Sequence, residues 1–498
     1  MIRLPVLTPL EHAAFVAAGL LAYVVVTRVR RQRRHPYAAL AWVMGIAAFP
    51  YLGLPLFLMF GTRKVVRPAT AQQPTPAGPW ADQAPRWATS LLAALGVPAA
   101  QPNDAVCFQA DGPAALAELQ AVIESAHHTL DVCTYVLGDD EVGAAVASAL
   151  AARARAGVRV RMLVDAIGSL KSAHSHDAVL QAAGVQRRLF MPALGRPRRG
   201  RTNMRNHRKV VVADRSRLWS GGRNLANEYF IGRAGEPAWL DLSFRADGPV
   251  AWQAQALFDG DWRLALGTRQ RPTNSYAERV ARMVTRNALE APMADRPAAA
   301  PPDTHAWTPE PSRTAAVRPL APLVQWVPSG PDFHEDTLHA LLVSAAFHAE
   351  ERLLLATPYF VPDEGVLEAL LLAAKRGVQI TLLLPERSNH ALADWARGRA
   401  VRELAEAGAQ VRLHPVMMHA KAVVVDHALA LCGSANLDSR SLFINYETMA
   451  AFYSDAEIAW LADWITRTAS EGVAASSAPP SWLRDIGEGI VATVAFQL

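Results

Sequence analysis

The chain has 498 residues, of which 51% are hydrophobic, so it is long enough to bury more than one large core. Its net charge of +5 suits an anionic partner without choosing between a lipid and a nucleic acid. The three isolated cysteines argue against a disulfide framework and a zinc site, and there is no Walker loop or dinucleotide fingerprint.

Two uncharged, apolar segments stand near the start of the chain, at residues 13–27 and 36–62, with five arginines between them. The second segment is long enough to span a bilayer. The first falls short of the about 17 to 25 residues usually needed, unless residues 4–10 extend it. A secretory signal is the competing interpretation, but no basic region precedes the first segment and no small-residue cleavage site follows it. We therefore predict a retained transmembrane hairpin over residues 1–66, with its second helix kinked at Pro50 and Pro55.

The charges around this hairpin bear on its orientation. The five arginines favour a cytoplasmic position for the loop between the two segments, because positive charge marks cytoplasmic loops. Arg63, Lys64 and Arg67 follow the second segment, so the difference in charge is small. The side of the membrane that the rest of the chain faces therefore stays open, and residues 67–103 are expected to form a linker.

Two stretches with the same order of expected elements follow, at residues 104–290 and 321–498. In each, an apolar strand leads to a helix that stops at a glycine, Gly157 or Gly377, and then to a second apolar strand. This alternation predicts a mainly parallel sheet with helices on its faces. Because the repeat occurs only twice, it predicts two lobes rather than a solenoid. Residues 291–320, rich in Pro and Ala, are expected to link the lobes or to pack on one of them.

Each stretch carries one copy of the pattern His-x-Lys-x-x-x-x-Asp, followed by a glycine turn and an asparagine. The chain has only five lysines among fifty basic residues, and two of them fill the same slot of this pattern. A single copy is typical of a solvated strand, but two copies with matching turns predict a duplicated half-site. The residues of the two copies are His207, Lys209, Asp214 and Asn224, and His419, Lys421, Asp426 and Asn436.

These residue types suit the chemistry of a phosphodiester. A lysine is a compact charged donor for a phosphoryl oxygen, and the asparagine amides and glycine turns add further donors. The apolar runs after each lysine predict buried strands, so that the histidine projects from the same face as the lysine. If the two copies met, one imidazole could attack the phosphorus while the other protonated the leaving alkoxide.

The duplicated motif resembles that of the phospholipase D superfamily, and the likeness covers nearly the whole chain after residue 104. It implies an α/β fold of two α-β-α sandwich lobes related by a pseudo-twofold axis, with one active site between them. It also implies a phosphohistidine intermediate formed without a metal or another cofactor. By this resemblance the two motifs are catalytic, although their aspartates Asp214 and Asp426 look structural, pairing away from the phosphate. The residues expected to line the phosphate site besides the motifs are Asn224, Asn436, Ser434 and Gly222.

Enzymes of this superfamily usually hold each imidazole at its other nitrogen with a carboxylate. Glu447 is expected to do this for the second lobe and Asp241 for the first, whereas a structural pairing of Glu447 with Arg440 is the alternative. Gly222 stands where the second copy has Ser434, so the first half-site is expected to lack one hydroxyl donor.

Two further features resemble bacterial cardiolipin synthases more narrowly. Residues 36–64 look like the membrane module that precedes these enzymes, and residues 357–362, Thr-Pro-Tyr-Phe-Val-Pro, resemble the entrance to their second lobe. The turn at residues 221–224 with Glu228, Tyr229 and Phe230 is closer to a second subgroup, which leaves the subtype and its preferred donor open.

The resemblance implies a multi-pass protein of the bacterial inner membrane that joins two phosphatidylglycerol molecules into cardiolipin and releases glycerol. Phosphatidylethanolamine is an alternative co-substrate, and nucleic acid is not expected as a partner. His207 is the expected nucleophile, and His419 is expected to act as acid and then as base, which gives a bell-shaped pH dependence. The alternative is a phosphodiesterase with water as acceptor, acting on phospholipid or on nucleic acid; the hairpin weighs against a nuclease.

Two other segments are candidates for membrane contact. Residues 190–205 combine apolar side chains with five arginines, and basic residues attract anionic lipid surfaces. Residues 482–498 have an amphipathic pattern. For both segments a solvated position is the alternative interpretation.

Overall fold

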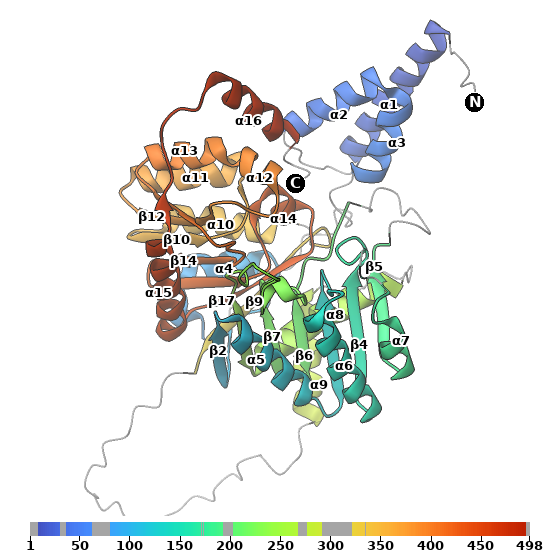
Figure 1. Ribbon diagram of the computed structural model, residues 1–498, viewed down its shortest axis with the longest axis vertical. Coiled ribbons are helices and arrows are strands. Elements are labelled where there is room, and N and C mark those ends of the chain that lie inside the picture. The colour runs from blue at the N-terminus through green and yellow to red at the C-terminus, as the bar shows by residue number, and fades with distance from the viewer. Residues whose placement is uncertain are drawn as a thin grey trace, which may run out of the picture.

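Two α/β lobes lie against each other, and three N-terminal helices project from one end of the pair (Figure 1). The structure is a computed structural model. It describes residues 8–29, 36–61, 80–170, 172, 174–192, 203–266, 276–290, 321–333 and 335–494. Most of the arginine-rich segment, the expected link between the lobes at residues 291–320, and the first part of the expected linker at residues 67–79 lie outside these ranges.

Each lobe is built on a sheet of seven equivalent strands. The first lobe contains β2 (Ala105–Gln109), β3 (Thr129–Thr134), β4 (Arg159–Asp165), β5 (Gln186–Phe190), β6 (Val210–Ala213), β7 (Arg217–Gly221) and β8 (Ser243–Asp247). The second contains β9 (Leu323–Ser329), β10 (Arg352–Ala356), β12 (Gln379–Pro385), β13 (Gln410–His414), β14 (Ala422–Val425), β15 (Leu429–Gly433) and β17 (Glu447–Phe452). Short strands β1 (Gln101–Pro102) and β18 (Val473–Ala474) extend the second sheet at its edges, and β11 (Phe360–Val361) pairs separately with β16 (Leu437–Asp438).

The two sheets have the same strand order, which confirms the predicted two-lobe α/β fold. The order is β2-β8-β7-β6-β3-β4-β5 in the first lobe and β9-β17-β15-β14-β10-β12-β13 in the second. Only the last three strands of each order run parallel, and the other neighbours are antiparallel. The sheets are therefore mixed rather than mainly parallel, because a crossover helix joins only the parallel strands, whereas tight turns join β6 to β7 and β14 to β15.

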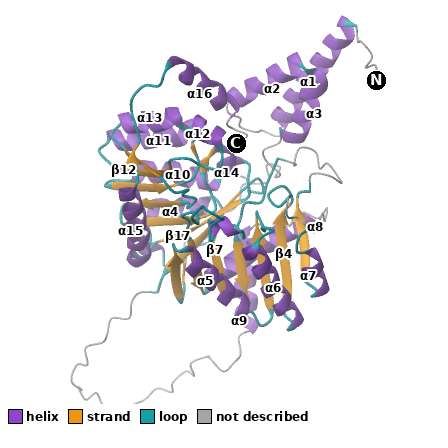
Figure 2. Ribbon diagram, in the orientation of Figure 1, coloured by secondary structure: helices purple, strands orange, loops and turns teal. Residues whose placement is uncertain are grey.

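Helices cover the sheets on both faces (Figure 2). Those of the first lobe are α5 (Gly112–Glu124), α6 (Glu141–Arg155), α7 (Asp177–Ala182), α8 (Pro249–Leu266) and α9 (Tyr276–Glu290), with the short helix η2 (Asn227–Tyr229). Those of the second are α10 (Thr337–His348), α11 (Glu364–Lys375), α12 (Ala391–Ala396), α13 (Gly398–Glu406), α14 (Ser439–Phe443), α15 (Asp455–Glu471) and α16 (Trp482–Val494).

One hydrophobic core is shared between the lobes. It joins side chains of both sheets, such as Phe244 and Phe452, with the buried faces of α8 and α15. Two further cores lie on the outer faces, one under α5 and α6 and the other under α10 and α11. Because the inner faces of both sheets contribute to the shared core, the two lobes are held in a fixed relation, as a site built from both requires.

The residues just before the first lobe pack on the second lobe. Helix α4 (Arg86–Ala94), which follows the short helix η1 (Ala81–Gln83), contributes Ala88 and Leu92 to the outer core of the second lobe, and β1 pairs with β9. The end of the segment that we expected to be a linker is therefore structured in the second lobe.

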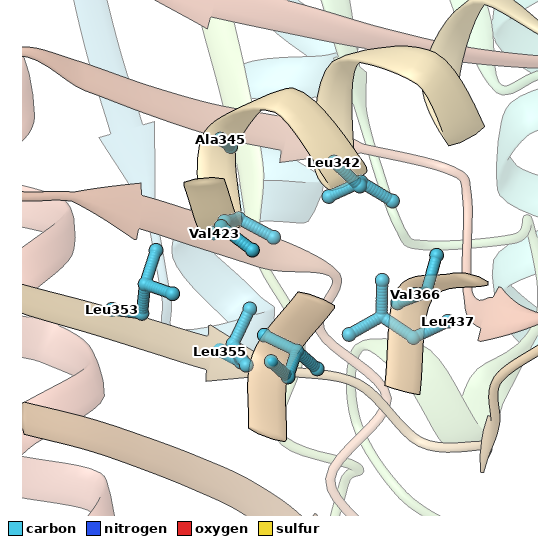
Figure 3. A pocket seen from close by; sticks show the side chains of 9 residues that line it. Leu342, Ala345, Leu353, Leu355, Val366, Val423 and Leu437 are labelled. Carbon is cyan, nitrogen blue, oxygen red and sulfur yellow. The ribbon is translucent and has the colours of Figure 1, made fainter. Parts of the chain in front are cut away.

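The outer core of the second lobe contains a small void between α10, α11 and the sheet (Figure 3). Its volume is about 10 Å³, and aliphatic side chains line it, among them Leu342, Leu355 and Val423. An apolar void at the lower limit of what one water molecule needs, roughly 10–15 Å³, stays empty. It is a packing defect and offers no ligand site.

The N-terminal segment folds as three helices, α1 (Pro9–Val29), α2 (Pro36–Ala48) and α3 (Pro50–Phe60). Helix α1 is long and apolar enough to cross a membrane over residues Pro9–Thr27, by length and composition, and is the one such helix in the described residues. The prediction of a single second helix over residues 36–62 was wrong, because Pro50 lacks an N–H and occupies the first turn of α3, which leaves Phe49 in a non-helical conformation. Pro55 lies inside α3.

The three N-terminal helices pack on one another through a large-residue cluster and a close glycine contact. Tyr23, Ile46 and Phe57 form a buried cluster between them. A Cβ added to Gly53 would lie 2.6 Å from the carbonyl oxygen of Gly45, so that only glycine allows α2 and α3 to approach this closely. Close approach at small residues is typical of helices that pack inside a membrane.

Candidate active site

The first motif histidine lies against a carboxylate of the second lobe. His207 stands three residues ahead of β6, and its Nδ1 lies 3.1 Å from a carboxylate oxygen of Glu447 and 3.2 Å from the carbonyl oxygen of Ser434. Glu447 is fully buried at the start of β17, and its carboxylate also accepts hydrogen bonds from the hydroxyls of Ser434 and Ser441. These contacts leave Nε2 as the ring nitrogen of His207 available for chemistry.

The second motif histidine makes the reciprocal contact with the first lobe. Nδ1 of His419 lies 2.6 Å from Oδ2 of Asp241, which is fully buried ahead of β8. The rings of Tyr229 and Trp239 pack beside the imidazole at centroid distances of 5.0 and 5.7 Å. The two half-sites therefore have the same construction, with acid and histidine exchanged between the lobes.

Backbone pairing between the lobes creates this exchange. His207 N–H donates to the carbonyl oxygen of Tyr446 at 2.9 Å, directly before Glu447. In the same way, His419 N–H donates to the carbonyl oxygen of Leu240 at 2.6 Å, directly before Asp241. Our assignment of each carboxylate to the histidine of its own lobe was therefore wrong. The segment that leads into each motif crosses to the other lobe and pairs there beside the acid.

The alternative partner of Glu447 is placed elsewhere by its own hydrogen bonds. The Arg440 guanidinium donates to the side-chain and backbone oxygens of Asn203, both at 3.0 Å. The Glu447 carboxylate instead accepts from His207, the two serines and, at 3.4 Å, Asn445.

Both motif lysines are fully buried beside their histidines. Lys209 Nζ donates to the carbonyl oxygen of His207 at 2.7 Å and lies 5.6 Å from the centre of the Tyr135 ring. Lys421 Nζ donates to the carbonyl oxygen of His419 and lies 2.8 and 2.9 Å from the two ring nitrogens. Like His207, Lys209 stands just ahead of its strand, so the motifs occupy the extended segments that enter β6 and β14.

The ionisable groups of the two half-sites influence one another across the lobe boundary. Burial lowers the pKa of Lys209 to about 7 and that of Lys421 to about 8, and each ammonium lowers the pKa of the opposite histidine. Burial together with Lys421 lowers the pKa of His419 to about 3, and burial lowers that of His207 below its ordinary value. At neutral pH both imidazoles are therefore neutral, and the pKa values of the two lysines lie close to neutral pH.

The two carboxylates stay ionised despite their burial. Burial would raise the pKa of Asp241, but His419, Lys421 and Arg223 outweigh it and hold the pKa at about 2. Burial likewise opposes His207 and Lys209 at Glu447, and the net pKa is below the ordinary value. Each carboxylate can therefore accept a hydrogen bond from the Nδ1–H group of its histidine. This hydrogen bond favours the tautomer in which Nε2 carries no proton.

The motif aspartates lie at the far ends of their strands from the histidines. Asp214 follows β6 and accepts three backbone N–H groups, from residues 127 to 129, at 2.7 to 2.8 Å. Asp426 follows β14 and accepts those of residues 350 to 352 at 2.8 to 3.0 Å. Each aspartate therefore joins the end of its own strand to the start of β3 or β10. This geometry gives them a structural role.

Replacing Asp214 or Asp426 with Asn tests that role. Asn tolerates the positive φ of 47° and 51° at these positions but loses the charge that the backbone N–H groups stabilise. We expect each variant to lose about 1–2 kcal/mol of unfolding free energy. Turnover per folded molecule should stay within about twofold of the parent, measured by denaturant unfolding alongside lipid turnover. A large loss of turnover at unchanged stability would assign these aspartates to the chemistry instead.

The two asparagines of the glycine turns are buried with one amide oxygen each unpaired. Asn224 Nδ2 donates to the hydroxyl of Tyr229 at 2.8 Å, and among the residues that the structure describes the Oδ1 atoms of Asn224 and Asn436 have no partner. A buried polar atom without a partner is costly and points to a ligand group. If the Asn224 amide turned by 180°, its Oδ1 would accept from Tyr229 and its NH₂ group would face outward as a donor.

Ser434 and Gly222 each lie against the carboxylate of their own lobe. Ser434 Oγ donates to Glu447 at 2.6 Å and accepts from the N–H of Thr448 at 3.0 Å, so its hydroxyl holds the carboxylate. At Gly222 an added Cβ would overlap Oδ1 of Asp241 and lie 2.9 Å from Cγ. Gly222 therefore leaves room for this carboxylate, and the expected lack of a hydroxyl donor to the phosphate at residue 222 stays a prediction. The carboxylate of Asp241, which is one methylene shorter than that of Glu447, occupies the space that a side chain at residue 222 would need.

Gly222→Ala should accordingly displace Asp241 from His419. We expect turnover to fall by about a hundredfold, because an unsupported imidazole loses its tautomer and orientation. The matched control is Ser434→Gly, which keeps room for Glu447 and removes one hydrogen bond, and should cost about tenfold or less. Steady-state turnover and thermal unfolding measured together would check this, and equal effects of the two substitutions would contradict the steric argument.

Several residues of the site escaped the sequence analysis. Tyr135 packs against the His207 ring at 5.0 Å between centroids, and Arg208 binds Asp261 at 2.6 and 2.7 Å. Arg208 Nε also donates to the carbonyl oxygen of Glu447 at 3.1 Å and ties the first motif to β17. An arginine between His207 and Lys209, where the second copy has Ala420, was the signal available.

Within the described residues no group of three His, Cys, Asp or Glu side chains could hold a metal ion. What the two half-sites present is a pair of neutral imidazoles, each backed by an ionised carboxylate, and two buried amines. This set of groups suits nucleophilic attack on a phosphodiester with general acid–base support.

Comparisons with known proteins agree with this geometry. The family described as "Cardiolipin synthase, PLD-like domain" matches residues 119–262 and 342–468, which together make up more than half of the chain. The family described as "Phospholipase_D-nuclease N-terminal" matches residues 18–61.

Curated relatives are similar over nearly the full length. The chain is 29% identical to Cardiolipin synthase A of Serratia proteamaculans over 493 residues, 92% of this chain and 93% of that protein. It is also 29% identical to Cardiolipin synthase A of Escherichia coli over 476 residues, 90% of this chain and 89% of that protein.

A solved structure is similar in fold. The phosphatidylserine synthase of Haemophilus influenzae superposes with a TM-score of 0.59 at 15% identity, over 81% of this chain and 98% of that chain. The family model and the curated relatives confirm the predicted superfamily. The chain is an enzyme of the phospholipase D superfamily and belongs to the family of cardiolipin synthases with a phospholipase D-like domain.

Proposed function

We propose that this enzyme transfers a phosphatidyl group from one phosphatidylglycerol to a second, which yields cardiolipin and glycerol. The observation that carries the proposal is the pair of histidines, each with its own buried carboxylate from the opposite lobe. Two equivalent imidazoles allow a displacement in two steps, one to load the phosphatidyl group and one to pass it on.

In the first step Nε2 of His207 attacks the phosphorus of the donor lipid. The new P–N bond forms as the bond from phosphorus to the glycerol oxygen breaks, and that oxygen takes a proton from His419. A bound phosphodiester anion favours the protonated form of His419, which burial and Lys421 disfavour. Glu447 accepts the Nδ1 proton of His207 in a hydrogen bond and stabilises the positive charge that the imidazole acquires.

In the second step His419, now neutral, takes the proton from a hydroxyl of the second phosphatidylglycerol. The hydroxyl oxygen attacks phosphorus, the P–N bond breaks, and its electron pair returns to Nε2 of His207. The two lysines support both steps through the phosphoryl oxygens, on which negative charge accumulates in the transition state. The order of the histidines follows the superfamily resemblance.

The product distribution tests this proposal. Purified enzyme is incubated with phosphatidylglycerol, and the lipids are analysed by mass spectrometry, with a His207→Ala, His419→Ala variant as control. We expect cardiolipin with one free glycerol for each molecule formed, and neither product from the control. Phosphatidic acid without cardiolipin would show hydrolysis, and condensation that requires phosphatidylethanolamine would change the assigned co-substrate.

For the location we propose a multi-pass protein of the bacterial inner membrane. Helix α1 would form the first span. Helices α2 and α3, which pack on each other at Gly45 and Gly53, would open at Pro50 to form the second. This hairpin places the N-terminus and both lobes on one side of the membrane. Topology reporters fused at the two chain ends should therefore give the same signal, and opposite signals would refute the hairpin.

A further inference from the structure

The helices α12 and α16 form one exposed apolar surface on the second lobe. Trp482, Leu483 and Ile486 of α16 are 69%, 65% and 52% exposed, and Leu392 and Trp395 of α12 are 52% and 49% exposed. We call these five side chains the apolar face. Large apolar side chains gathered in this way mark a contact surface rather than ordinary scatter.

The orientation of α16 is set by its opposite side. Glu488 is buried and accepts from Arg402 of α13 at 2.7 Å and from Arg484 at 3.0 Å. At the flank of the apolar face, Gly487 lies against Trp395, so close that an added Cβ would be 2.9 Å from the indole ring. Helix α16 is therefore held on α13 by a buried ion pair and on α12 by a close contact. Because Glu488 faces the lobe, the apolar side chains on the other side of α16 face outward.

The apolar face is continuous with the N-terminal helices. Helix α16 contacts α2, and Figure 1 shows the two helices side by side at the end of the molecule where α1, α2 and α3 project. Because α16 contacts α2, the apolar face lies beside the helices that would enter a bilayer. A bilayer interface accommodates Trp and aliphatic side chains on one side of an amphipathic helix.

The same surface leads to the phosphate site. Helix α12 starts directly after His390, whose ring packs 5.2 Å from that of Tyr359, and the Tyr359 hydroxyl donates to Asn389 at 2.5 Å. Tyr359 follows β10 as Tyr135 follows β3, and Tyr135 packs against His207. The segment after β12, which carries Leu392 and Trp395 of the apolar face, therefore borders the edge of the sheet at which the motifs enter.

The first lobe repeats this arrangement in outline. Its equivalent loop, after β4, exposes Ile167 and Leu170, which are 41% and 68% exposed, and Ser169 of that loop donates to the carbonyl oxygen of Tyr135 at 3.0 Å. Both loops at the same edge of the two sheets thus present apolar side chains beside the site.

We infer that the apolar face of α12 and α16 lies in the interfacial layer of the lipid bilayer and holds the phosphate site at the level of the lipid headgroups. The inference rests on the proposed lipid substrate. A phosphatidyl donor could then reach His207 and His419 while its acyl chains stay in the membrane. No extraction of the whole lipid into water is required.

Depth-dependent quenching tests the location without using activity. Ile486→Cys in the full chain with Cys107→Ser is labelled with an environment-sensitive fluorophore; Cys133 and Cys432 are buried. The protein is reconstituted in phosphatidylglycerol and phosphatidylethanolamine vesicles containing lipids brominated near the headgroup end of their chains. The matched control is Val179→Cys on α7, an aliphatic residue that is 44% exposed. We expect at least twofold quenching at residue 486 and none at residue 179.

Equal fluorescence with and without brominated lipid at residue 486 would overturn the inference. A blue-shifted but unquenched signal, together with a dimer in light scattering of the reconstituted enzyme, would also overturn it and assign the face to a second copy of the chain.

A kinetic arm separates this inference from the proposed function. The variant Trp482→Asp, Leu483→Asp, Ile486→Asp should lose at least about tenfold in turnover of phosphatidylglycerol in vesicles. Its turnover of a short-chain, monomeric phosphatidylglycerol should stay within about twofold of the parent.

If the variant and the parent turned over the vesicle substrate at the same rate, the inference would be refuted. If the parent enzyme forms no cardiolipin from either substrate, the proposed function fails, whatever the quenching shows. If the variant does not fold, the single-cysteine arm decides alone.

Discussion

Lys209→Met and Lys421→Met should each lower turnover at least about a thousandfold while leaving the folded state no less stable. A buried ammonium beside the reacting phosphoryl group acts where negative charge develops, and loss of such a group typically costs several powers of ten. Burial lowers the pKa of Lys209 to about 7 and that of Lys421 to about 8, so each charge is disfavoured by the fold. Met fills a similar volume without that cost.

The sign of the pH effect follows from proton binding. An unfolded lysine keeps its proton up to about pH 10. The folded protein releases it near pH 7 at Lys209 and near pH 8 at Lys421, so the folded state binds fewer protons between these values and pH 10. On this account the unfolding free energy of the parent should rise across that window, and each Met variant should show a smaller rise. Denaturant unfolding at pH 7 and pH 9.5, with turnover measured on the same samples, checks both parts. A parallel loss of stability and turnover would mean that the lysines mainly support the fold.

Glu447→Gln and Asp241→Asn should each reduce turnover by about a hundredfold to ten-thousandfold, and each should act on the histidine of the opposite lobe. Removing an orienting carboxylate beside a catalytic imidazole leaves the geometry but destabilises the useful tautomer and the charged ring. The Glu447 carboxylate raises the pKa of His207, and the Asp241 carboxylate raises that of His419, against the larger effect of burial. The amide variants should therefore lower the pKa of the opposite histidine further.

Histidine NMR with carbon labelling can follow this effect residue by residue. In Glu447→Gln the His207 resonance should keep its neutral shift to lower pH than in the parent, while the His419 resonance should change little; Asp241→Asn should do the reverse. The control is Glu457→Gln on α15, another acid with little exposed surface, which should move neither resonance. If Glu447→Gln altered His419 and left His207 unchanged, the crossing of acids between lobes would be wrong.

Much of the fold could be predicted from local patterns in the amino-acid sequence. The repeated His-x-Lys-x-x-x-x-Asp, the apolar runs of four residues behind each lysine and the glycine stops at Gly157 and Gly377 are local signals. Each depends on neighbours within one strand or one helix turn, and these signals predicted two lobes, buried β6 and β14, and a motif pair at one site. The sequence analysis predicted that Pro50 kinks the second apolar segment. It did not predict that the segment divides there into α2 and α3, because a proline is the local signal for both a kink and a break.

The amino-acid sequence by itself thus determined the duplication, the histidines and lysines of the site, and its phosphoryl chemistry, because these follow from residue type and short spacing. Tertiary structure alone decided that Glu447 serves His207 and Asp241 serves His419, that Ser434 holds a carboxylate, and that Gly222 makes room for one. It also decided that α4 packs on the second lobe. The physical reason is that the acid–histidine contacts join segments from opposite lobes, separated by 240 residues for His207 and Glu447. Ser434 and Gly222 meet their carboxylates across paired strands of one sheet, β15 with β17 and β7 with β8. The pairing of such segments depends on the packing of two complete sheets around their shared core, which spacing along the chain does not record.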